Sequence, residues 1–475
     1  MATEKMQKRP HAIMISLHYQ GHITPFVNLA LKLGSKGLSV TFVHNEFVHH
    51  KLSQSHKINE FNLFPEACES GLDIRYTTIS DGFPVEFDRF RHEEEYMESV
   101  LRDFPARVDE FVGKMIESNP SLATFLVADT LYSWPATIAK KYNLVNVSFW
   151  TQPALVFSLN YHFELLRENG HFPCKDNMEE EINYIPGIES INTRDLMPYL
   201  KEAEMATVSP KIVINSFEGV KKADFILHNT IYELEPATLS ALNKNQSNYA
   251  IGPISFSQNL GKTNPIKCLN LWSDSDCTQW LDSKPPGSVL YISFGSLVEV
   301  SKLVIQEIAH GILLSEVNFI WIVRGGMTDA LPNGFEDKMK DKGLIVPWCN
   351  QMEVLSNPCI GGFLTHCGWN SIQESIWCRV PMICYPLSYD QPTNRRLVVD
   401  VWKIGIDLSD GVPINREGIA ENIRKLMSAS TSEGLRTEAR KMRDILWNAI
   451  ENGGSSDINF DQFIKDLKAK LHAMD

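Results

Sequence analysis

The stretch 348–391 constrains the fold of this chain most, because it repeats one pattern: a short apolar run, then glycine or polar residues, then a helix start. Residues 360–365 form such a run, which glycine brackets and a polar cluster from His366 follows. This is typical of a buried parallel strand that enters a tight turn, with a helix from about Asn370. Two further apolar runs lie on either side, at 343–346 and 382–385. The pattern predicts an α/β fold with a parallel sheet.

The same stretch contains residue types that suit a nucleotide-sugar. The turn before the predicted helix offers free backbone N–H groups and the positive end of the helix dipole. A diphosphate is therefore expected over Gly368, Asn370 and Ser371, with His366 as a side-chain donor. Trp348 can stack on a uracil ring. Gln351 and Glu374 are candidates to bind the ribose hydroxyls. Asp390 and Gln391, expected at the carboxyl end of a strand, are candidates to bind the hydroxyls of the sugar.

Each of these residues also has a plainer interpretation. Ser371-x-x-Glu374 is the pattern of a capping box, in which both side chains only satisfy N–H groups at a helix start. Trp348 and Trp369 could be ordinary core aromatics. His366-Cys367 could suggest a metal, but the chain has no C-x-x-C spacing, so a zinc site is not expected.

The amino-terminal segment predicts a second unit of the same kind. Residues 11–17 form an apolar run, and Gly21-His22 is expected to make the turn after it. Thr24-Pro25 has the pattern of a helix cap followed by proline at the first helical position, and the helix is expected to reach about residue 35. Gly37 then ends it before a strand at 38–43. This βαβ start places His22 at the carboxyl end of a strand, where ligands bind.

The order of these motifs resembles the signature box of the plant family 1 glycosyltransferases, which runs Trp, Gln, a GGF-x-x-HCGWNS core, Glu and a closing Asp-Gln. The resemblance covers nearly the whole chain. It implies the GT-B architecture, with two Rossmann-like doubly wound parallel-sheet domains that face each other across a cleft. The expected domains are 1–252 for the acceptor, a linker at 253–278, and 279–455 for the UDP-sugar. A carboxyl-terminal helix at 456–475 is expected to pack back onto the first domain.

The resemblance also assigns roles to single residues. It implies that His22 is the general base and that Asp129, which follows the apolar run 124–128, is its partner. A carboxylate bonded to one ring nitrogen fixes the tautomer and raises the basicity of the other. The remaining implied contacts are Ser296 with the diphosphate, Cys349 with UDP through its main chain, and Thr151 and Trp369 with the transferred sugar.

The reaction that the resemblance implies is inverting. The acceptor oxygen attacks the anomeric carbon of UDP-glucose in line with the departing UDP, so an α-linked donor gives a β-O-glucoside. Gln391 is the residue that the family associates with glucose. The expected acceptor is a hydrophobic, hydroxylated plant metabolite such as a terpenoid or a phenolic, and the sequence does not choose between these classes.

Composition sets limits on this interpretation. A chain of 475 residues with 43% hydrophobic residues is long enough for two cores. The formal charge of −13 argues against nucleic acid as a partner. The first apolar run is too short for a signal peptide, and nine cysteines without a framework pattern suit the cytoplasm, so the sequons at Asn146 and Asn245 are read as chance matches. No membrane span is expected, and the protein is expected to be a monomer.

Two other motifs are expected to carry no function. Gly261-Lys262-Thr263 looks like the end of a P-loop, but Phe256 stands where the first glycine is required. Asp274-Ser275-Asp276 matches the D-x-D pattern of metal-dependent sugar transferases, yet it precedes a helix candidate, where Asp is a good cap. No metal and no cofactor are therefore expected.

Two alternative functions come from other classes. A non-catalytic UDP-sugar sensor would keep the donor residues without turnover. A dinucleotide-dependent oxidoreductase would need a G-x-G-x-x-G turn, which the first βα turn at 18–22 lacks. The signature box also departs from the family at Asn350, Asn357 and Arg379. Arg379 stands where the family has glycine, so a positive φ there would cost about 1 kcal/mol.

Overall fold

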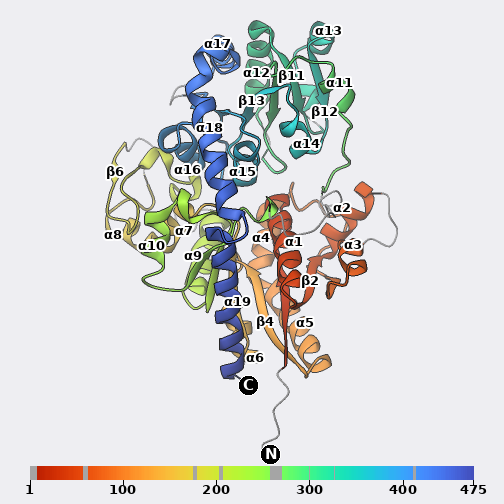
Figure 1. Cartoon of the computed structure of the whole chain (residues 1–475), viewed down its shortest axis with the longest axis vertical. Coiled ribbons are helices and arrows are strands. Elements are labelled where there is room, and N and C mark those ends of the chain that lie inside the picture. Colours follow the sequence, from red (N-terminus) through yellow and green to blue (C-terminus); the bar gives the residue numbers. More distant parts are fainter. Residues whose placement is uncertain are drawn as a thin grey trace, which may run out of the picture. The chain divides into compact units, whose positions relative to one another are not determined.

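The computed structural model describes residues 8–56, 62–174, 179–202, 207–256, 270–298, 300–325, 327–409 and 413–474 (Figure 1). The chain forms two compact units. Unit 1 comprises Met1–Thr193, Tyr199–Leu271 and Asn448–Asp475, and unit 2 comprises Arg194–Pro198 and Trp272–Trp447. The domain boundaries expected from the sequence stay predictions. The motif at 261–263 lies outside the described residues.

Unit 1 contains a seven-stranded parallel sheet in the order β3–β2–β1–β4–β5–β8–β9. Its strands are β1 (Arg9–Ile15), β2 (Ser39–Asn45), β3 (Ile74–Ile79), β4 (Leu122–Asp129), β5 (Val145–Trp150), β8 (Phe225–His228) and β9 (Asn248–Ala250). A separate antiparallel pair joins β6 (Glu181–Ile182) to β7 (Ile191–Asn192). All residues of β2 and β5 are buried, as expected for parallel strands that helices cover on both faces.

Helices cover both faces of this sheet. The helices of unit 1 include α1 (Gln20–Ser35), α2 (Glu46–His56), α3 (Pro65–Glu69), α4 (Glu93–Arg102), α5 (Phe104–Ser118), α6 (Pro135–Tyr142), α7 (Ala154–Tyr161), α8 (Phe163–Glu168), α9 (Val208–Val220), α10 (Pro236–Leu242) and α19 (Ser455–Met474). On one face, Ile13 and Leu126 pack with Val108 of α5. On the other, Phe26 of α1 lies 5.0 Å from Phe149 of β5 between ring centroids. Side chains alternate along each strand, so this arrangement is doubly wound.

The first helix begins earlier than the sequence predicted. Tyr19, with an extended backbone, is its N-cap, so Thr24 is not the cap and Pro25 lies inside the helix. The N–H groups of His22 and Ile23 both donate to the carbonyl oxygen of Tyr19, at 2.9 Å each. The cap prediction is wrong because this earlier turn closes on main-chain bonds alone, without a side-chain cap, and a proline near a helix start removes only one such bond. His22 therefore lies in the first turn of α1 and not in the loop before it.

Unit 2 contains a six-stranded parallel sheet in the order β12–β11–β10–β13–β14–β15. Its strands are β10 (Val289–Ser293), β11 (Asn318–Ile322), β12 (Gly343–Val346), β13 (Ile360–Thr365), β14 (Met382–Cys384) and β15 (Gly405–Asp407). Its helices include α11 (Thr278–Asp282), α12 (Lys302–Ser315), α13 (Phe335–Met339), α14 (Gln351–Ser356), α15 (Trp369–Trp377), α16 (Gln391–Arg396) and α17 (Arg416–Met427). The π-helical turn Leu397–Val401 continues α16. The longer α18 (Ala429–Ile450) follows α17.

Both sheets reverse their strand order at one place, which confirms the predicted doubly wound α/β class. The reversal lies between β1 and β4 in unit 1 and between β10 and β13 in unit 2. Open α/β sheets bind ligands outside the carboxyl ends of the strands at such a switch point. The loops after these four strands are therefore the places to examine for function.

The last helix packs within unit 1. Phe463 of α19 lies 5.7 Å from Phe225 and 5.6 Å from Tyr249 between ring centroids, and the Tyr249 hydroxyl donates to Asp466 at 2.7 Å. These contacts place α19 against β8 and β9, the last two strands in the order of the sheet. In the described ranges, no helix combines the length and the apolar character that a membrane span requires.

Candidate active site

A histidine and an aspartate meet at the switch point of unit 1. His22 lies in the first turn of α1, and Asp129 is the last residue of β4. Nδ1 of His22 lies 2.6 Å from Oδ2 of Asp129, and both residues are buried. The other carboxylate oxygen accepts a hydrogen bond from the N–H of Leu131 at 3.0 Å. The aspartate thus holds the ring through Nδ1, which leaves Nε2 as the basic nitrogen.

Thr151, which the sequence assigned to the transferred sugar, lies against the same histidine. It follows β5, and its hydroxyl oxygen is 3.2 Å from Nδ1 of His22. The residue is 3% exposed, so its hydroxyl lies among the buried polar atoms of the His22–Asp129 pair. The structure therefore gives Thr151 a contact with the imidazole, which sequence reasoning did not expect.

Aromatic rings surround the loop between β1 and α1. The rings of Tyr19 and Tyr96 lie 4.0 Å and 4.6 Å from His18, between centroids, and Phe90 lies at 5.6 Å. Burial, followed by the nearby His22 and Arg89, lowers the pKa of His18 to about 3, so this imidazole is neutral. Neither of its nitrogens has a hydrogen-bond partner within the described part of the chain. Sequence reasoning missed His18 because only the folded loop reveals its unpaired nitrogens.

The predicted phosphate turn lies at the start of α15 in unit 2. Gly368 is the N-cap residue, with an extended backbone and no side-chain cap bond, so Asn370 and Ser371 are the second and third helical residues. The capping-box alternative for Ser371 and Glu374 is wrong, because Ser371 is not at the cap. Both side chains bind Gln351 instead: its Nε2 lies 2.9 Å from Ser371 Oγ and 2.6 Å from Glu374 Oε2.

Gln351 is therefore the centre of a prearranged polar cluster at the start of α14. Its Oε1 accepts a hydrogen bond of 3.1 Å from the hydroxyl of Tyr291, a buried residue of β10 that the sequence did not single out. Burial raises the pKa of Glu374 to about 7, and the hydrogen bond from Gln351 opposes this shift. At neutral pH the carboxyl group can therefore hold or release a proton with little cost.

The imidazole of His366 is enclosed by two glycines. A Cβ atom at Gly295 or at Gly368 would stand 2.5 Å from Nε2 of His366, so neither position accepts a side chain. Burial, followed by Arg324, lowers the pKa of His366 to about 4, while a hydrogen bond to the Ser293 backbone opposes the shift. Nδ1 of this ring is buried and has no hydrogen-bond partner in the described residues.

The loop after β10 carries Ser296, the other residue that the sequence assigned to the diphosphate. The guanidinium of Arg324 donates to the carbonyl oxygen of Ser296 and, at 2.8 Å, to that of Val298. Arg324 thus fixes the main chain of this loop. Sequence reasoning missed it because no motif marks it.

Trp348, the predicted uracil platform, has a second tryptophan beside it. The ring of Trp272 lies 4.7 Å from that of Trp348 between centroids, with an interplanar angle of 32°. The side chain of the adjacent Cys349 is buried. A hydrogen bond with Cys277, followed by burial, raises the pKa of the Cys349 thiol. The thiol is therefore not available to a ligand, and the contact of the Cys349 main chain with UDP stays a prediction. Asn350 caps α14 by accepting from the N–H of Glu353 at 3.3 Å.

The predicted sugar residues Asp390 and Gln391 lie at the start of α16. Oε1 of Gln391 accepts hydrogen bonds from the N–H groups of Leu387 and Ser388 at 2.8 Å and 2.9 Å. This orients the side-chain amide so that its Nε2 is the atom left to donate to a ligand. Asp390 is buried and bonded to Asn394, a residue outside the predicted set. Trp369 is also buried, with its ring 6.1 Å from that of Trp402.

Two further departures from the family pattern have structural explanations. Arg379 has a φ of 61°, so it occupies the left-handed conformation for which glycine is the usual residue. Asn357 follows α14; it donates to Asp282 at the end of α11 at 3.0 Å and accepts from the N–H of Cys359 at 3.0 Å, so it joins the ends of these two helices.

The D-x-D motif has a structural role. Asp276 Oδ1 accepts a hydrogen bond of 2.9 Å from the N–H of Thr278, the first residue of α11. Throughout the described ranges, no group of three or more His, Cys, Asp or Glu side chains could hold a metal ion.

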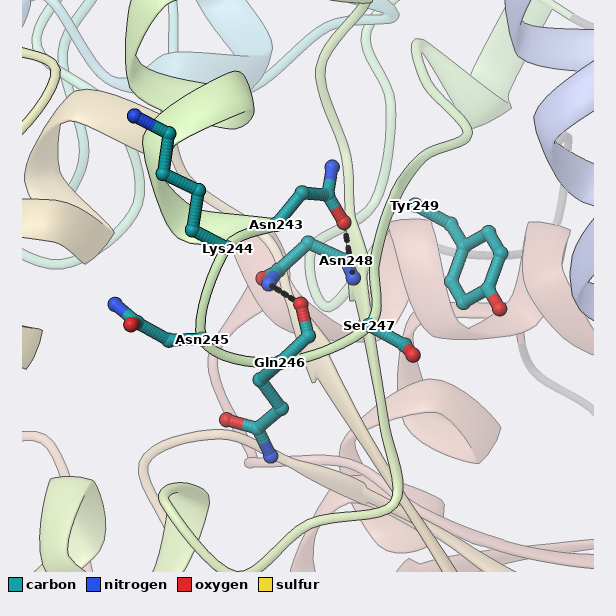
Figure 2. Close-up of a pocket in the computed structure, with 7 residues that line it drawn as sticks. All are labelled: Asn243, Lys244, Asn245, Gln246, Ser247, Asn248 and Tyr249. Atoms are coloured by element: carbon teal, nitrogen blue, oxygen red, sulfur yellow. Dashed lines mark hydrogen bonds between the residues drawn. The ribbon is translucent and has the colours of Figure 1, made fainter.

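A separate polar cavity of about 340 Å³ lies at the loop between α10 and β9 (Figure 2). Residues 243–249 line it, and the side chain of Asn243 accepts from the N–H of Asn248 at 2.9 Å. The cavity is at the amino end of β9, whereas His22 and Asp129 lie at the carboxyl ends of their strands. It is therefore not part of the candidate active site.

The chain is similar in sequence and in structure to known sugar transferases that use UDP-sugars. A family model described as UDP-glucoronosyl and UDP-glucosyl transferase matches residues 246–428. The chain is 47% identical over 474 residues to UDP-glycosyltransferase 86A1 of Arabidopsis thaliana, covering 98% of this chain and 96% of that one. It is 32% identical over 492 residues to 7-deoxyloganetin glucosyltransferase of Catharanthus roseus, covering 99% of each. The crystal structure of Medicago truncatula UGT71G1 complexed with UDP-glucose is similar with a TM-score of 0.81 at 25% identity, covering 98% of this chain and 100% of that one.

Proposed function

The chain belongs to the plant UDP-glycosyltransferases, and we propose that it transfers glucose from UDP-glucose to a hydroxyl group of a small hydrophobic plant metabolite, with inversion to a β-O-glucoside. Glycosyl transfer follows from the family. The donor sugar, the acceptor class, the stereochemistry and the roles of single residues are parts of the proposal.

The observation that carries the proposal is the 2.6 Å contact between His22 Nδ1 and Asp129 Oδ2. Asp129 keeps the proton of the neutral ring on Nδ1, so Nε2 can take the proton of the acceptor hydroxyl. Asp129 then stabilises the imidazolium that forms. Thr151, 3.2 Å from the same Nδ1, helps to hold the ring in this orientation.

The donor contacts are assigned to unit 2. The N–H groups and the positive dipole end at the start of α15 suit the diphosphate, with Gly368, Asn370 and Ser371 there and Ser296 in the loop after β10. The helix dipole offsets the charge that develops on the departing UDP, so the step needs no metal ion. Gln351 and Glu374, already 2.6 Å apart, suit the two ribose hydroxyls.

UDP-glucose is the proposed donor because Asp390 and Gln391 offer an acceptor and a donor side by side. The carboxylate of Asp390 can accept from a sugar hydroxyl, and the Nε2 of Gln391 can donate to one because its Oε1 is occupied. Relatives whose names include glucosyltransferase support this choice. The aromatic rings of Tyr19 and Phe90, which lie beside His18 in the loop that leads to His22, favour a hydrophobic acceptor, either a terpenoid or a phenolic.

The test is UDP release from UDP-glucose with a panel of terpenoid and phenolic alcohols, in the intact chain and in His22→Ala. General-base assistance contributes about 10²–10⁴-fold, so the variant should lose acceptor-dependent release and keep its affinity for UDP. Retention of most of the rate in the variant would show that His22 is not the base. Binding of UDP-glucose without release, for every acceptor, would favour a non-catalytic sensor.

A further inference from the structure

Asn394 joins two parts of the donor site. It lies in α16 and is fully buried. Its Nδ2 is 2.7 Å from Asp390 Oδ2 and 2.9 Å from the carbonyl oxygen of Cys367. Asp390 precedes the sugar residue Gln391, and Cys367 precedes the phosphate residue Gly368. One amide group therefore connects the loop after β13 to the start of α16.

The residue that Asn394 holds has an unfavourable backbone conformation. Cys367 has a φ of 68°. This left-handed conformation is unfavourable for an L-residue, so it persists only where surrounding contacts determine it. Two such contacts exist: the N–H of Cys367 donates to Thr365 Oγ1 at 3.1 Å, and its carbonyl oxygen accepts from Asn394.

The bond to Asn394 also decides where the next N–H group points. In a trans peptide the carbonyl oxygen and the following N–H point in opposite directions. Because the carbonyl of Cys367 points to the buried Asn394, the N–H of Gly368 points away from it. In the described part of the chain this N–H has no hydrogen-bond partner, and it lies at the N-cap of α15.

The helix that carries Asn394 is itself anchored. Arg395, also buried, forms ion pairs with Asp195, with Asp400 at 3.2 Å and with Asp407 at 3.2 Å. The hydroxyl of Thr393 donates to the main chain of Asp195 at 2.7 Å. These contacts hold α16 in place, so Asn394 has a defined position from which to orient its two partners.

We propose that Asn394 is a positioning residue, which directs the Gly368 N–H towards the donor diphosphate and the Asp390 carboxylate towards the donor sugar. This inference rests on the proposed function, because both partners are assigned there to UDP-glucose. Because Asn394 is fully buried and its amide is bonded to Cys367 and Asp390, its effect is expected to pass through these two groups.

The experiment compares the dissociation constants of UDP and UDP-glucose, measured by isothermal titration calorimetry, in the full chain and in Asn394→Leu. Leucine has a similar volume but cannot donate a hydrogen bond. The affinity for UDP is expected to fall about tenfold, because a phosphate contact is misdirected, and that for UDP-glucose several-fold further. Asp390→Asn should lower the affinity for UDP-glucose and leave the affinity for UDP unchanged. When Asn394→Leu is added to Asp390→Asn, the ratio of the dissociation constants of UDP and UDP-glucose should no longer change. This would show that the two residues are coupled.

A purely structural role would give another result. Asn160→Leu is the matched control, because Asn160 is buried in unit 1 and its Nδ2 donates to Tyr199 at 3.0 Å. It should lower Tm without changing either constant. If Asn394→Leu behaves in the same way, the inference is overturned. If the intact chain does not bind UDP, the proposed function fails.

A second variant covers the case in which Asn394→Leu does not fold. Glycine adopts a left-handed backbone without strain, so adding Cys367→Gly should restore folding by removing the need for the anchor. It should not restore the affinity for UDP, because the direction of the Gly368 N–H is then free to vary. Normal affinity in this double variant would also overturn the inference.

Discussion

Nδ1 of His22 lies 2.6 Å from Oδ2 of Asp129, and the strand that ends at Asp129 pairs with the strand that leads into His22. Parallel pairing of β1 with β4 brings together two residues that are 107 positions apart in the chain. The pair is therefore a product of sheet topology, and its chemistry depends on the carboxylate as much as on the imidazole.

Asp129→Asn should remove most of the activity without removing the donor site. An amide cannot stabilise the imidazolium and allows the proton of the neutral ring to move to Nε2, so kcat should fall by about 10²–10⁴-fold. The dissociation constant of UDP should stay the same, because its proposed contacts lie in unit 2. Steady-state kinetics with UDP-glucose and titration with UDP measure the two quantities, and an unchanged kcat would remove Asp129 from the mechanism.

Glu374→Gln should change how stability depends on pH. The pKa of Glu374 is raised from 4.5 to about 7 in the folded chain, so folding favours the protonated form. Its contribution is fully present below about pH 4.5 and is lost as the pH rises through about 7. The loss in the free energy of unfolding is at most about 3 kcal/mol, since the side chain keeps some exposure.

Urea unfolding at pH 5 and pH 8 tests this. The intact chain should lose more stability between these values than Glu374→Gln, which cannot ionise. The variant should also bind UDP more weakly, because glutamine replaces the carboxylate that is proposed to bind a ribose hydroxyl. Equal pH dependence in both proteins would show that Glu374 is not the group that titrates.

Tyr291→Phe should make the side chain of Gln351 less well oriented. The substitution removes the hydroxyl that donates to Gln351 Oε1 at 3.1 Å and leaves the ring in place. A lost buried hydrogen bond costs about 1 kcal/mol of stability, and the affinity for UDP should fall several-fold because Gln351 is less well oriented. Tyr132→Phe removes a similar buried bond, to the carbonyl of Ser16 at 3.0 Å in unit 1, and should affect stability alone. Equal UDP affinities in both variants would contradict the role of Tyr291.

Arg379→Gly should stabilise the protein. Arg379 follows α15 with a φ of 61°, and the N–H of Val380 donates to the carbonyl of Ser375 at 2.9 Å, as in a Schellman motif. Glycine avoids the left-handed strain, so the free energy of unfolding should rise by about 1 kcal/mol. Arg379→Ala keeps the strain and should change little. A gain in the alanine variant equal to that in the glycine variant would mean that the guanidinium, not the backbone, is unfavourable.

Removal of divalent metal ions should leave catalysis unchanged. The helix start at Gly368 offers N–H groups for the diphosphate, and the carboxylate of Asp276 already accepts a hydrogen bond from the first N–H of α11. UDP release should therefore be the same with and without EDTA. A large loss that Mg²⁺ restores would assign Asp274 and Asp276 to metal binding.

The strands were predicted well because buried parallel strands are continuous apolar runs with clear ends. The predictions for 343–346 and 360–365 coincide with β12 and β13. The helix starts were predicted less well. At α1 the expected cap Thr24 was wrong, and at α15 the alternative cap Ser371 was wrong, because main-chain bonds at Tyr19 and an uncapped Gly368 start these helices. A side-chain pattern does not reveal a cap that the main chain makes.

Local apolar runs and motifs that are continuous in the chain were enough to predict the fold class and the family, and they named most of the candidate site residues. They could not specify which side chains meet, because that depends on how the whole chain folds. Tyr291 reaches Gln351, Arg324 reaches Ser296, and Asn394 reaches Cys367 from a separate helix. These contacts join residues far apart in sequence, and their energy depends on distances of about 3 Å that no local pattern specifies.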